Sequence, residues 1–187
     1  MSFHLDFEEA DAFATGAIGM PGARTFYVQV RAEGRVITVK CEKQQVAQMA
    51  DHLRGMLSDL PEPQTRPDTN AAMLSGSVEP DFVLGTIGLG IDRASQRMVV
   101  QLEEVATVDI DPEEFDELDV DDPEEVMEFI RRHEEDADTS MVRVLLTADQ
   151  ARSFCSVAET IVESGRSVCR WCEDPMDPAG HACPKFN

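Results

Sequence analysis

The sequence predicts an α+β fold. Two internally repeated units, each a β-hairpin followed by a helix, are expected to form an antiparallel sheet packed by helices, with a small zinc-ribbon-like tail. In each half of the 187-residue chain, segments with strand-like alternation precede a helical apolar stripe. The halves also match: residues 13–19 resemble 82–88 at an offset of 69, and 25–30 resemble 97–102 at an offset of 72.

The next strand of each unit shows the same relationship at a larger offset. A turn at Gly34 leads into residues 36–39, whose counterpart, residues 141–146, lies 105 residues further along the chain. The offset grows by 105 − 72 = 33 residues, which indicates an insertion in the loop of the second hairpin.

Both strand pairs lead into amphipathic helices. Apolar residues in 46–57 keep the i, i+3, i+4, i+7 spacing, and the same stripe returns 105 residues later in 151–162. Thr147 and Gln150 have the form of a capping box at the second helix. A unit of about 60 residues buries too little to be stable alone, so we expect the halves to join in one sheet or in two layers related by a pseudo-two-fold axis. The predicted units are a first repeat (1–60), a linker (61–77), a second repeat (78–165) with an acidic insertion (103–138), and a zinc-binding tail (166–187).

The net charge of −21 is concentrated in the insertion. Residues 103–138 hold 18 acidic and two basic residues and so contribute −16 of that total. A surface this acidic disfavours nucleic acid and anionic membranes, because both are bound largely through Lys and Arg. The chain has no run of about 20 apolar residues and no secretory signal pattern, so we expect a cytoplasmic protein. Proline followed by carboxylates, at 111–115 and at 121–130, predicts one or two short helices in this stretch.

The tail carries the most specific chemical pattern of the chain. Cys169, Cys172, His181 and Cys183 have the spacing Cys-x2-Cys-x8-His-x-Cys. Two thiolates two residues apart can hold one edge of a zinc tetrahedron, and a returning segment can supply the other two ligands. Three thiolates and an imidazole leave no position for water, so we expect a structural Zn²⁺. The alternatives are a redox pair formed by Cys169 and Cys172, and an unliganded tail of reduced thiols.

Three polar residues are candidates for a ligand site between the repeats. Arg24 follows the glycine-rich residues 16–22, and Gln29 and Gln101 take matching positions in the repeated strands. The plainer interpretation is that the glycines form a tight turn, that Arg24 pairs with a surface carboxylate, and that duplication explains the matched glutamines. A deep cleft lined by the three residues would favour the ligand site, and a flat, packed pseudo-axis would count against it.

These features predict a non-enzymatic protein-binding or adaptor protein. Its acidic insertion would meet a basic patch on a protein partner, and its zinc tail would dock against that partner. The alternative is a small enzyme or ligand-binding protein with its site between the two repeats. Exposed edge strands additionally predict that two copies can pair as a homodimer.

A family resemblance rests on three motifs that span nearly the whole chain. Residues 19–29, the turn at 82–88 and the closing Cys-x2-Cys-x8-His-x-Cys-Pro pattern at 169–184 together resemble an uncharacterised actinobacterial family, classed as a domain of unknown function. The resemblance implies an actinobacterial cytoplasmic protein and supports the metal assignment, and it brings no established activity or catalytic residue.

Overall fold

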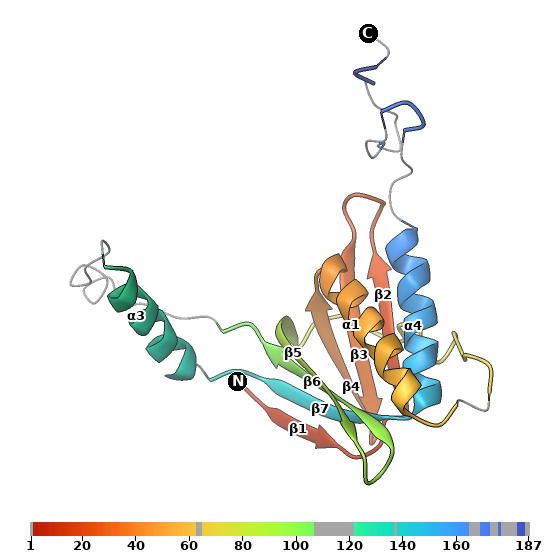
Figure 1. Cartoon of the computed structure of the whole chain (residues 1–187), viewed down its shortest axis with the longest axis horizontal. Coiled ribbons are helices and arrows are strands. Elements are labelled where there is room, and N and C mark those ends of the chain that lie inside the picture. The colour runs from red at the N-terminus through yellow and green to blue at the C-terminus, as the bar shows by residue number, and fades with distance from the viewer. Residues whose placement is uncertain are drawn as a thin grey trace.

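In the described part of the chain, the fold is mixed α+β, with a seven-stranded sheet and three α-helices (Figure 1). The computed structural model describes residues 2–62, 65–106, 122–136, 138–164, 169–172, 176 and 183–185. The elements are β1 (His4–Phe7), β2 (Ala12–Ile18), β3 (Thr25–Ala32), β4 (Arg35–Cys41), α1 (Lys43–Met56), the 3-10 turn η1 (Leu57–Asp59), β5 (Phe82–Asp92), β6 (Arg97–Glu104), α3 (Pro123–Asp136), β7 (Met141–Leu146) and α4 (Ala148–Glu163).

The sheet is continuous, in the order β1-β7-β6-β5-β4-β3-β2, and two of its strand pairs are parallel. β4 pairs with β5 through Val39 and Phe82, and β7 pairs with β1 through Val144 and Phe7. The expectation of a wholly antiparallel sheet is therefore wrong at these two junctions. The β4–β5 pair is parallel because α1 and the segment after it return the chain across the sheet, as a parallel connection requires.

The strand ladders on either side of the β4–β5 junction have the same register. Val28 of β3 lies opposite Val39 of β4, and Val100 of β6 lies opposite Val144 of β7. We call β2, β3, β4 and α1 the first half, and β5, β6, β7 and α4 the second half. Positions in β3 and β6 therefore correspond at an offset of 72, and positions in β4 and β7 at an offset of 105.

The first strand of each half departs from the offset read in the sequence. Gly16 lies opposite Tyr27, and the residue opposite Val99 in the second half is Gly90. The structural offset between β2 and β5 is thus 90 − 16 = 74 rather than 69. The register of β5 shifts between Leu84 and Ile87, where local sequence similarity no longer follows the strand pairing.

One hydrophobic core joins both halves and both of the long core helices. α1 and α4 lie side by side against one face of β2–β4 (Figure 1). Phe154 of α4 packs on Phe13 of β2 with ring centroids 4.6 Å apart, and both side chains are buried. α4 of the second half therefore covers a strand of the first half, so that neither half has a separate core.

Side-chain caps fix the starts of both core helices. The Thr147 hydroxyl accepts a hydrogen bond from the Gln150 N–H, and the Gln150 carbonyl oxygen accepts one from the Thr147 N–H, as the capping-box pattern predicted. At α1, the Glu42 N–H donates to the Gln45 side chain. The two glutamine amides also bind the backbone of other segments: Gln150 donates to the carbonyl of Ala10, just before β2, and Gln45 to that of Leu84 in β5.

Part of the linker covers the outer face and the edge of the first half. The Thr15 N–H donates to the Ala72 carbonyl, which extends the sheet beyond β2. Gln29, fully buried on the outer face, accepts from the Ser75 N–H at 2.9 Å and donates to the Ser75 carbonyl at 3.2 Å. The guanidinium of Arg31 donates to the Ser75 hydroxyl at 2.6 Å. The open edge and outer face of β2–β3 are thus covered from within the chain.

The acidic insertion contains α3, which stands apart from the sheet and the α1–α4 layer (Figure 1). Asp122 caps the helix through its carboxylate, which accepts from the Glu124 N–H at 2.9 Å. This is the helix expected at 121–130. The other segment considered for a helix, residues 111–115, lies outside the described residues.

Candidate metal centre

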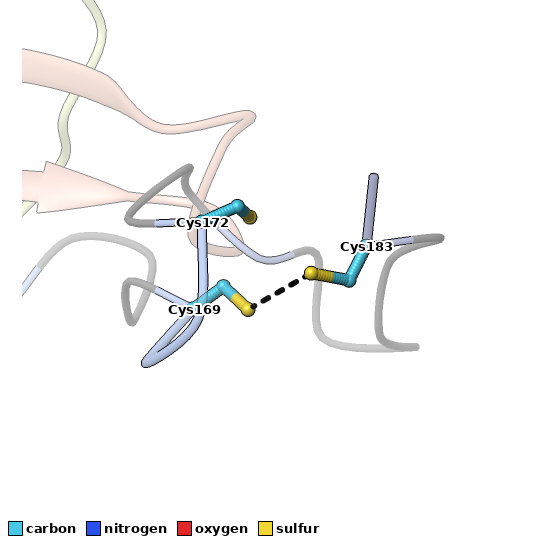
Figure 2. Close-up of side chains that lie close together, drawn as sticks. All are labelled: Cys169, Cys172 and Cys183. Carbon is cyan, nitrogen blue, oxygen red and sulfur yellow. Dashed lines mark hydrogen bonds between the residues drawn. The ribbon is translucent and has the colours of Figure 1, made fainter. Parts of the chain in front are cut away.

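The three cysteines of the tail, which follow α4 in the chain, lie close together (Figure 2). Cys169 and Cys172 are joined by a turn, and Cys183 lies opposite them. The three sulfur atoms lie within 4.8 Å of one another, and the Sγ atoms of Cys169 and Cys183 are 3.8 Å apart. The arrangement brings together side chains that are 14 residues apart in the chain.

The sulfur distances suit a shared metal ion better than a disulfide. A disulfide requires an S–S distance of about 2.05 Å. In a tetrahedral zinc site with Zn–S bonds of about 2.3 Å, neighbouring sulfurs stand about 3.8 Å apart. The separation of 3.8 Å between Cys169 and Cys183 therefore equals one edge of such a tetrahedron. Thiolate donors favour zinc over the hard cations, which prefer oxygen.

The environment of Cys169 favours its thiolate form. Hydrogen bonds from the backbone N–H groups of Cys172 and Trp171, supported by the two neighbouring thiols, lower the pKa of Cys169 to about 6. The Cys169 side chain is also 4% exposed, whereas Cys172 and Cys183 are partly exposed. Since the thiolate is the form that binds metals, the turn prepares this residue as a ligand.

The turn between the first two cysteines also orders two large side chains. The guanidinium of Arg170 lies 4.9 Å from the centroid of the Trp171 ring, which is cation–π geometry. Trp171 is 48% exposed. The described part of the tail therefore presents a partly exposed aromatic surface next to the cysteine cluster.

The other two cysteines belong to the core, and their pKa values are raised where that of Cys169 is lowered. Burial, with a smaller effect of Glu42, raises the pKa of Cys41 to about 12. Burial likewise raises the pKa of Cys155 to about 11, and its thiol donates to the carbonyl of Ala50. Both thiols remain protonated and behave as small apolar side chains.

The fourth predicted ligand, His181, lies outside the described residues. Of the four candidate metal ligands, the structure thus brings together Cys169, Cys172 and Cys183.

The three candidate residues for a ligand site lie at separate places. Arg24 donates to the Ser164 hydroxyl at the end of α4, and Gln29 holds the linker. Gln101, on the outer face of β6, donates to the carboxylate of Glu103. Two strands, β4 and β5, lie between β3 and β6, so the two glutamines are at least about 14 Å apart across the sheet at the usual strand spacing.

A hollow of about 510 Å³ between α1 and α4 was not predicted from the sequence. Its lining includes Arg54 and Glu159, which form an ion pair at 3.5 Å, together with Arg152 and Cys155. These residues sit on helices from different halves, so no spacing in the sequence signals the hollow.

The comparisons with known proteins give a family and no function. Residues 5–183 match a family model described as "Protein of unknown function (DUF3090)". No curated protein and no solved structure matches the chain. Among the described residues, no helix combines the length and apolarity that crossing a membrane would require.

Proposed function

The chain belongs to the DUF3090 family, and we propose that it acts as a non-enzymatic binding or adaptor protein with a structural zinc tail and an acidic arm. The observation that carries the proposal is the cluster of Cys169, Cys172 and Cys183. A cluster of this kind clamps a short segment, and the partly exposed Trp171 beside it gives the segment an aromatic contact for a protein partner.

The metal assigned here is Zn²⁺, with His181 as the fourth ligand. Three thiolates and one neutral imidazole complete a tetrahedron and leave no open position for water or substrate. The ion would therefore act as a structural ligand of the tail. Cys169 is buried and yet outside the core cluster, which supports a tail that is stabilised by its own metal.

The acidic arm, which we define as residues 105–139, would bind a basic patch on the partner protein. The ends of the arm meet as the ends of a hairpin loop do, because the Glu104 N–H donates to the Ser140 carbonyl at 2.8 Å. In the first half, the corresponding hairpin is closed by only Glu33 and Gly34, both with positive φ. The arm thus stands where a two-residue turn would suffice for the fold, which supports a role in binding.

We infer further that the two halves arose as copies of one unit. The equal register of the two ladders supports this, as do the parallel junctions at Val39 and Val144, which are corresponding positions. The capping glutamines Gln45 and Gln150 also correspond, and each reaches the start of a strand in the opposite half. The unit boundaries of this proposal are 1–60, 61–77, 78–165 and 166–187.

We also propose that the protein is cytoplasmic and that its host is an actinobacterium. The thiols of Cys41 and Cys155 are free in the core, and a thiolate metal site is typical of reducing compartments. The partner is a protein rather than nucleic acid or a membrane, because the chain carries 37 acidic against 16 basic residues.

A homodimer would use the edge strand β1. The other edge strand, β2, already pairs with the linker at Met73.

Native mass spectrometry of the protein purified without added metal tests the zinc tail. We expect one zinc per chain in the wild type and in Cys41→Ser, the control for a core thiol. Cys169→Ser, Cys183→Ser and His181→Ala should each lose most of the metal while retaining the far-ultraviolet circular dichroism of the core. A wild-type protein without metal, or a His181→Ala variant with full occupancy, would contradict the assignment of the site or of its fourth ligand.

An arm-exchange variant, in which residues 105–139 are replaced by Glu-Gly, tests the adaptor role. The variant copies the first hairpin and is expected to fold. A partner captured from host extract and then purified should bind the wild type more weakly as salt rises, because salt screens exposed charges over about 8 Å at physiological ionic strength. The same partner should bind the arm-exchange variant at least about tenfold more weakly. Equal affinity for both proteins would reject the acidic arm as a binding element.

A second candidate function, ligand binding between the halves, is favoured by the hollow between α1 and α4. Its rim carries two cations and two carboxylates, Arg54, Arg152, Glu62 and Glu159. A thermal-shift screen of small zwitterions tests this candidate, with Arg152→Ala as the matched variant. A ligand that stabilises the wild type and not the variant would support it, and the adaptor proposal does not depend on the result.

A further inference from the structure

The outer face of each half carries a glycine and a glutamine that form a binding site for an extended peptide, which we call the seat. Described residues fill only the seat of the first half. Gly16 and Gly90 occupy corresponding positions, opposite Tyr27 and Val99. Gln29 and Gln101 also correspond, since each lies next to the valine that marks the common register of the ladders. Each half therefore presents a glycine and a glutamine on neighbouring strands of the same face.

The seat in the first half shows how such a pair holds a peptide. A Cβ atom added to Gly16 would lie 2.6 Å from the side chain of Leu74, so this glycine makes room for a leucine. The next residue, Ser75, is held through its backbone, because the Gln29 amide accepts from its N–H and donates to its carbonyl. The edge of β2 adds a backbone hydrogen bond from Thr15 to Ala72. The seat thus recognises one apolar side chain and the backbone around it.

The corresponding seat in the second half is open. No atom of the described residues lies within 4 Å of a Cβ atom built on Gly90. The Gln101 side chain is partly exposed, and its amide donates to Glu103 of the same strand instead of to a peptide. Beyond Phe82 and Val83, β5 has no strand paired to its β4 side in the described ladder.

The charges around the open seat favour a cationic peptide. The two arginines of this face, Arg97 and Arg143, are paired with Glu9 at 2.9 Å and with Asp6 at 2.8 Å. The carboxylates of Asp92 and Glu103 lie on the same face and form no ion pair with the described residues. Hydrogen bonds from Ser95 and the Ala94 N–H lower the pKa of Asp92, which keeps this carboxylate charged. Lysine or arginine on either side of the apolar residue would complement these charges.

We propose that the β5–β6 face at Gly90 and Gln101 binds an extended segment of a partner protein by β-strand addition. The segment places a leucine-sized side chain over Gly90, a small residue beside Gln101, and basic residues toward Asp92 and Glu103. Backbone hydrogen bonds would supply affinity and the glycine seat would supply side-chain selection, as in other cases of strand addition. The seat is a third surface of the molecule, independent of the zinc tail and of the acidic arm.

The test uses a fluorescein-labelled peptide that copies residues 71–77 and carries two lysines at each end, titrated with the full-length protein in a fluorescence anisotropy assay. The wild type should bind it with a dissociation constant below about 100 μM, and replacing the four lysines by glutamates should weaken binding at least about tenfold. No saturable binding to the wild type, or equal binding of the lysine and glutamate peptides, would overturn the proposal.

Gly90→Val tests the seat itself. The backbone of Gly90 does not have positive φ and no described atom crowds the site, so valine should be accepted without loss of stability. It should reduce peptide binding by at least about tenfold, and Gln101→Ala should do so by about threefold to tenfold. Gly55→Ala, which adds a methyl group in open space on α1, should bind as the wild type does. Gly90→Ala replaces the valine variant if the latter does not fold.

Two outcomes would assign the seat to another occupant. Undiminished binding by a folded Gly90 variant would show that the peptide binds elsewhere. Binding by the arm-exchange variant alone would show that the arm of the same chain fills the seat. Either result overturns the assignment to a partner protein, and neither bears on whether the tail holds zinc.

Discussion

The two halves of the molecule share their buried faces and differ in what they present to solvent. β3 and β4 have the same register as β6 and β7, and both pairs bury a valine at the centre of the ladder, Val28 and Val100. The first half closes its hairpin with Glu33 and Gly34 and covers its outer face with its own linker. The second half carries the acidic arm and leads into the cysteine tail. Its outer face at Gly90 is not covered by any described residue.

The difference separates residues that hold the fold from residues available for binding. Both halves have the inward-facing strand ladder and the capped helix, because these surfaces fill one common core. The acidic arm, the uncovered face at Gly90 and the cysteine tail belong to the second half, and the core does not need them. We therefore expect the binding surfaces on the second half, and corresponding positions in the first half provide the comparison for each of them.

The largest expected effect tests whether the halves share one core. Phe154→Ala in α4 removes a fully buried ring that packs on Phe13, and Met49→Ala makes the corresponding change in α1. The first should cost about 3–5 kcal/mol and the second about 2–5 kcal/mol in the free energy of unfolding. Both variants should unfold in a single transition in urea, followed by far-ultraviolet circular dichroism. Two separate transitions would show that the halves are independent units.

The corresponding glutamines should differ in their contribution to stability. Gln29→Ala removes the partner of the Ser75 N–H and carbonyl in a buried place, and should cost about 1–3 kcal/mol. Gln101→Ala acts at a partly exposed position and should change stability by at most about 0.5 kcal/mol. Urea denaturation of the two variants under the same conditions measures the contrast. Equal losses would mean that the second seat is as fully occupied as the first.

Alkaline pH should destabilise the protein through one thiol in each half. The pKa values of Cys41 and Cys155 are raised in the folded state to about 12 and about 11, so their stabilising effect is complete below the unfolded pKa of 9.0 and is lost as pH rises toward those values. Each thiol contributes a slope on the order of 1 kcal/mol per pH unit in this window. Cys41→Ala and Cys155→Ala should each flatten the fall in stability between pH 9 and pH 11. A slope that neither variant changes would assign the alkaline loss to other groups.

The smallest contrast concerns the helix caps. Thr147→Ala removes a side-chain cap of α4 and should cost about 1 kcal/mol. Glu42 makes its capping contact through its backbone N–H, which an alanine retains, so Glu42→Ala should cost no more than about 0.5 kcal/mol. Thermal unfolding of the two variants measures the difference. A larger loss for Glu42→Ala would mean that its carboxylate supports α1 more than the geometry indicates.

Most of the strands and helices could be predicted from the sequence because their signals are local. The alternation in 25–30 and 97–102 and the stripes in 46–57 and 151–162 each reflect contacts within a few residues. β1 was not predicted, since four residues carry too short a pattern and its partner β7 lies at the far end of the chain. The parallel junctions could not be predicted either, because strand order depends on packing between distant segments.

The candidate sites divide in the same way. The proximity of Cys169, Cys172 and Cys183 followed from their spacing, which is a short-range property of the chain. The open seat at Gly90 was missed, because the sequence match points to Gly85 as the counterpart of Gly16. In the strand pairing, Gly16 lies opposite Tyr27 and Gly90 lies opposite Val99, the counterpart of Tyr27, and only this pairing shows the correspondence.

The pairing of β1 with β7 also sets an order in time during synthesis. β1 leaves the ribosome before residues 8–140, all of which precede its partner strand. β2, β3, β4 and α1 can assemble early through contacts that are close in the chain, whereas β1 has to wait for the penultimate element of the fold. We therefore expect the closing of this edge to be a late event in folding, and the waiting strand to be a natural target for a chaperone.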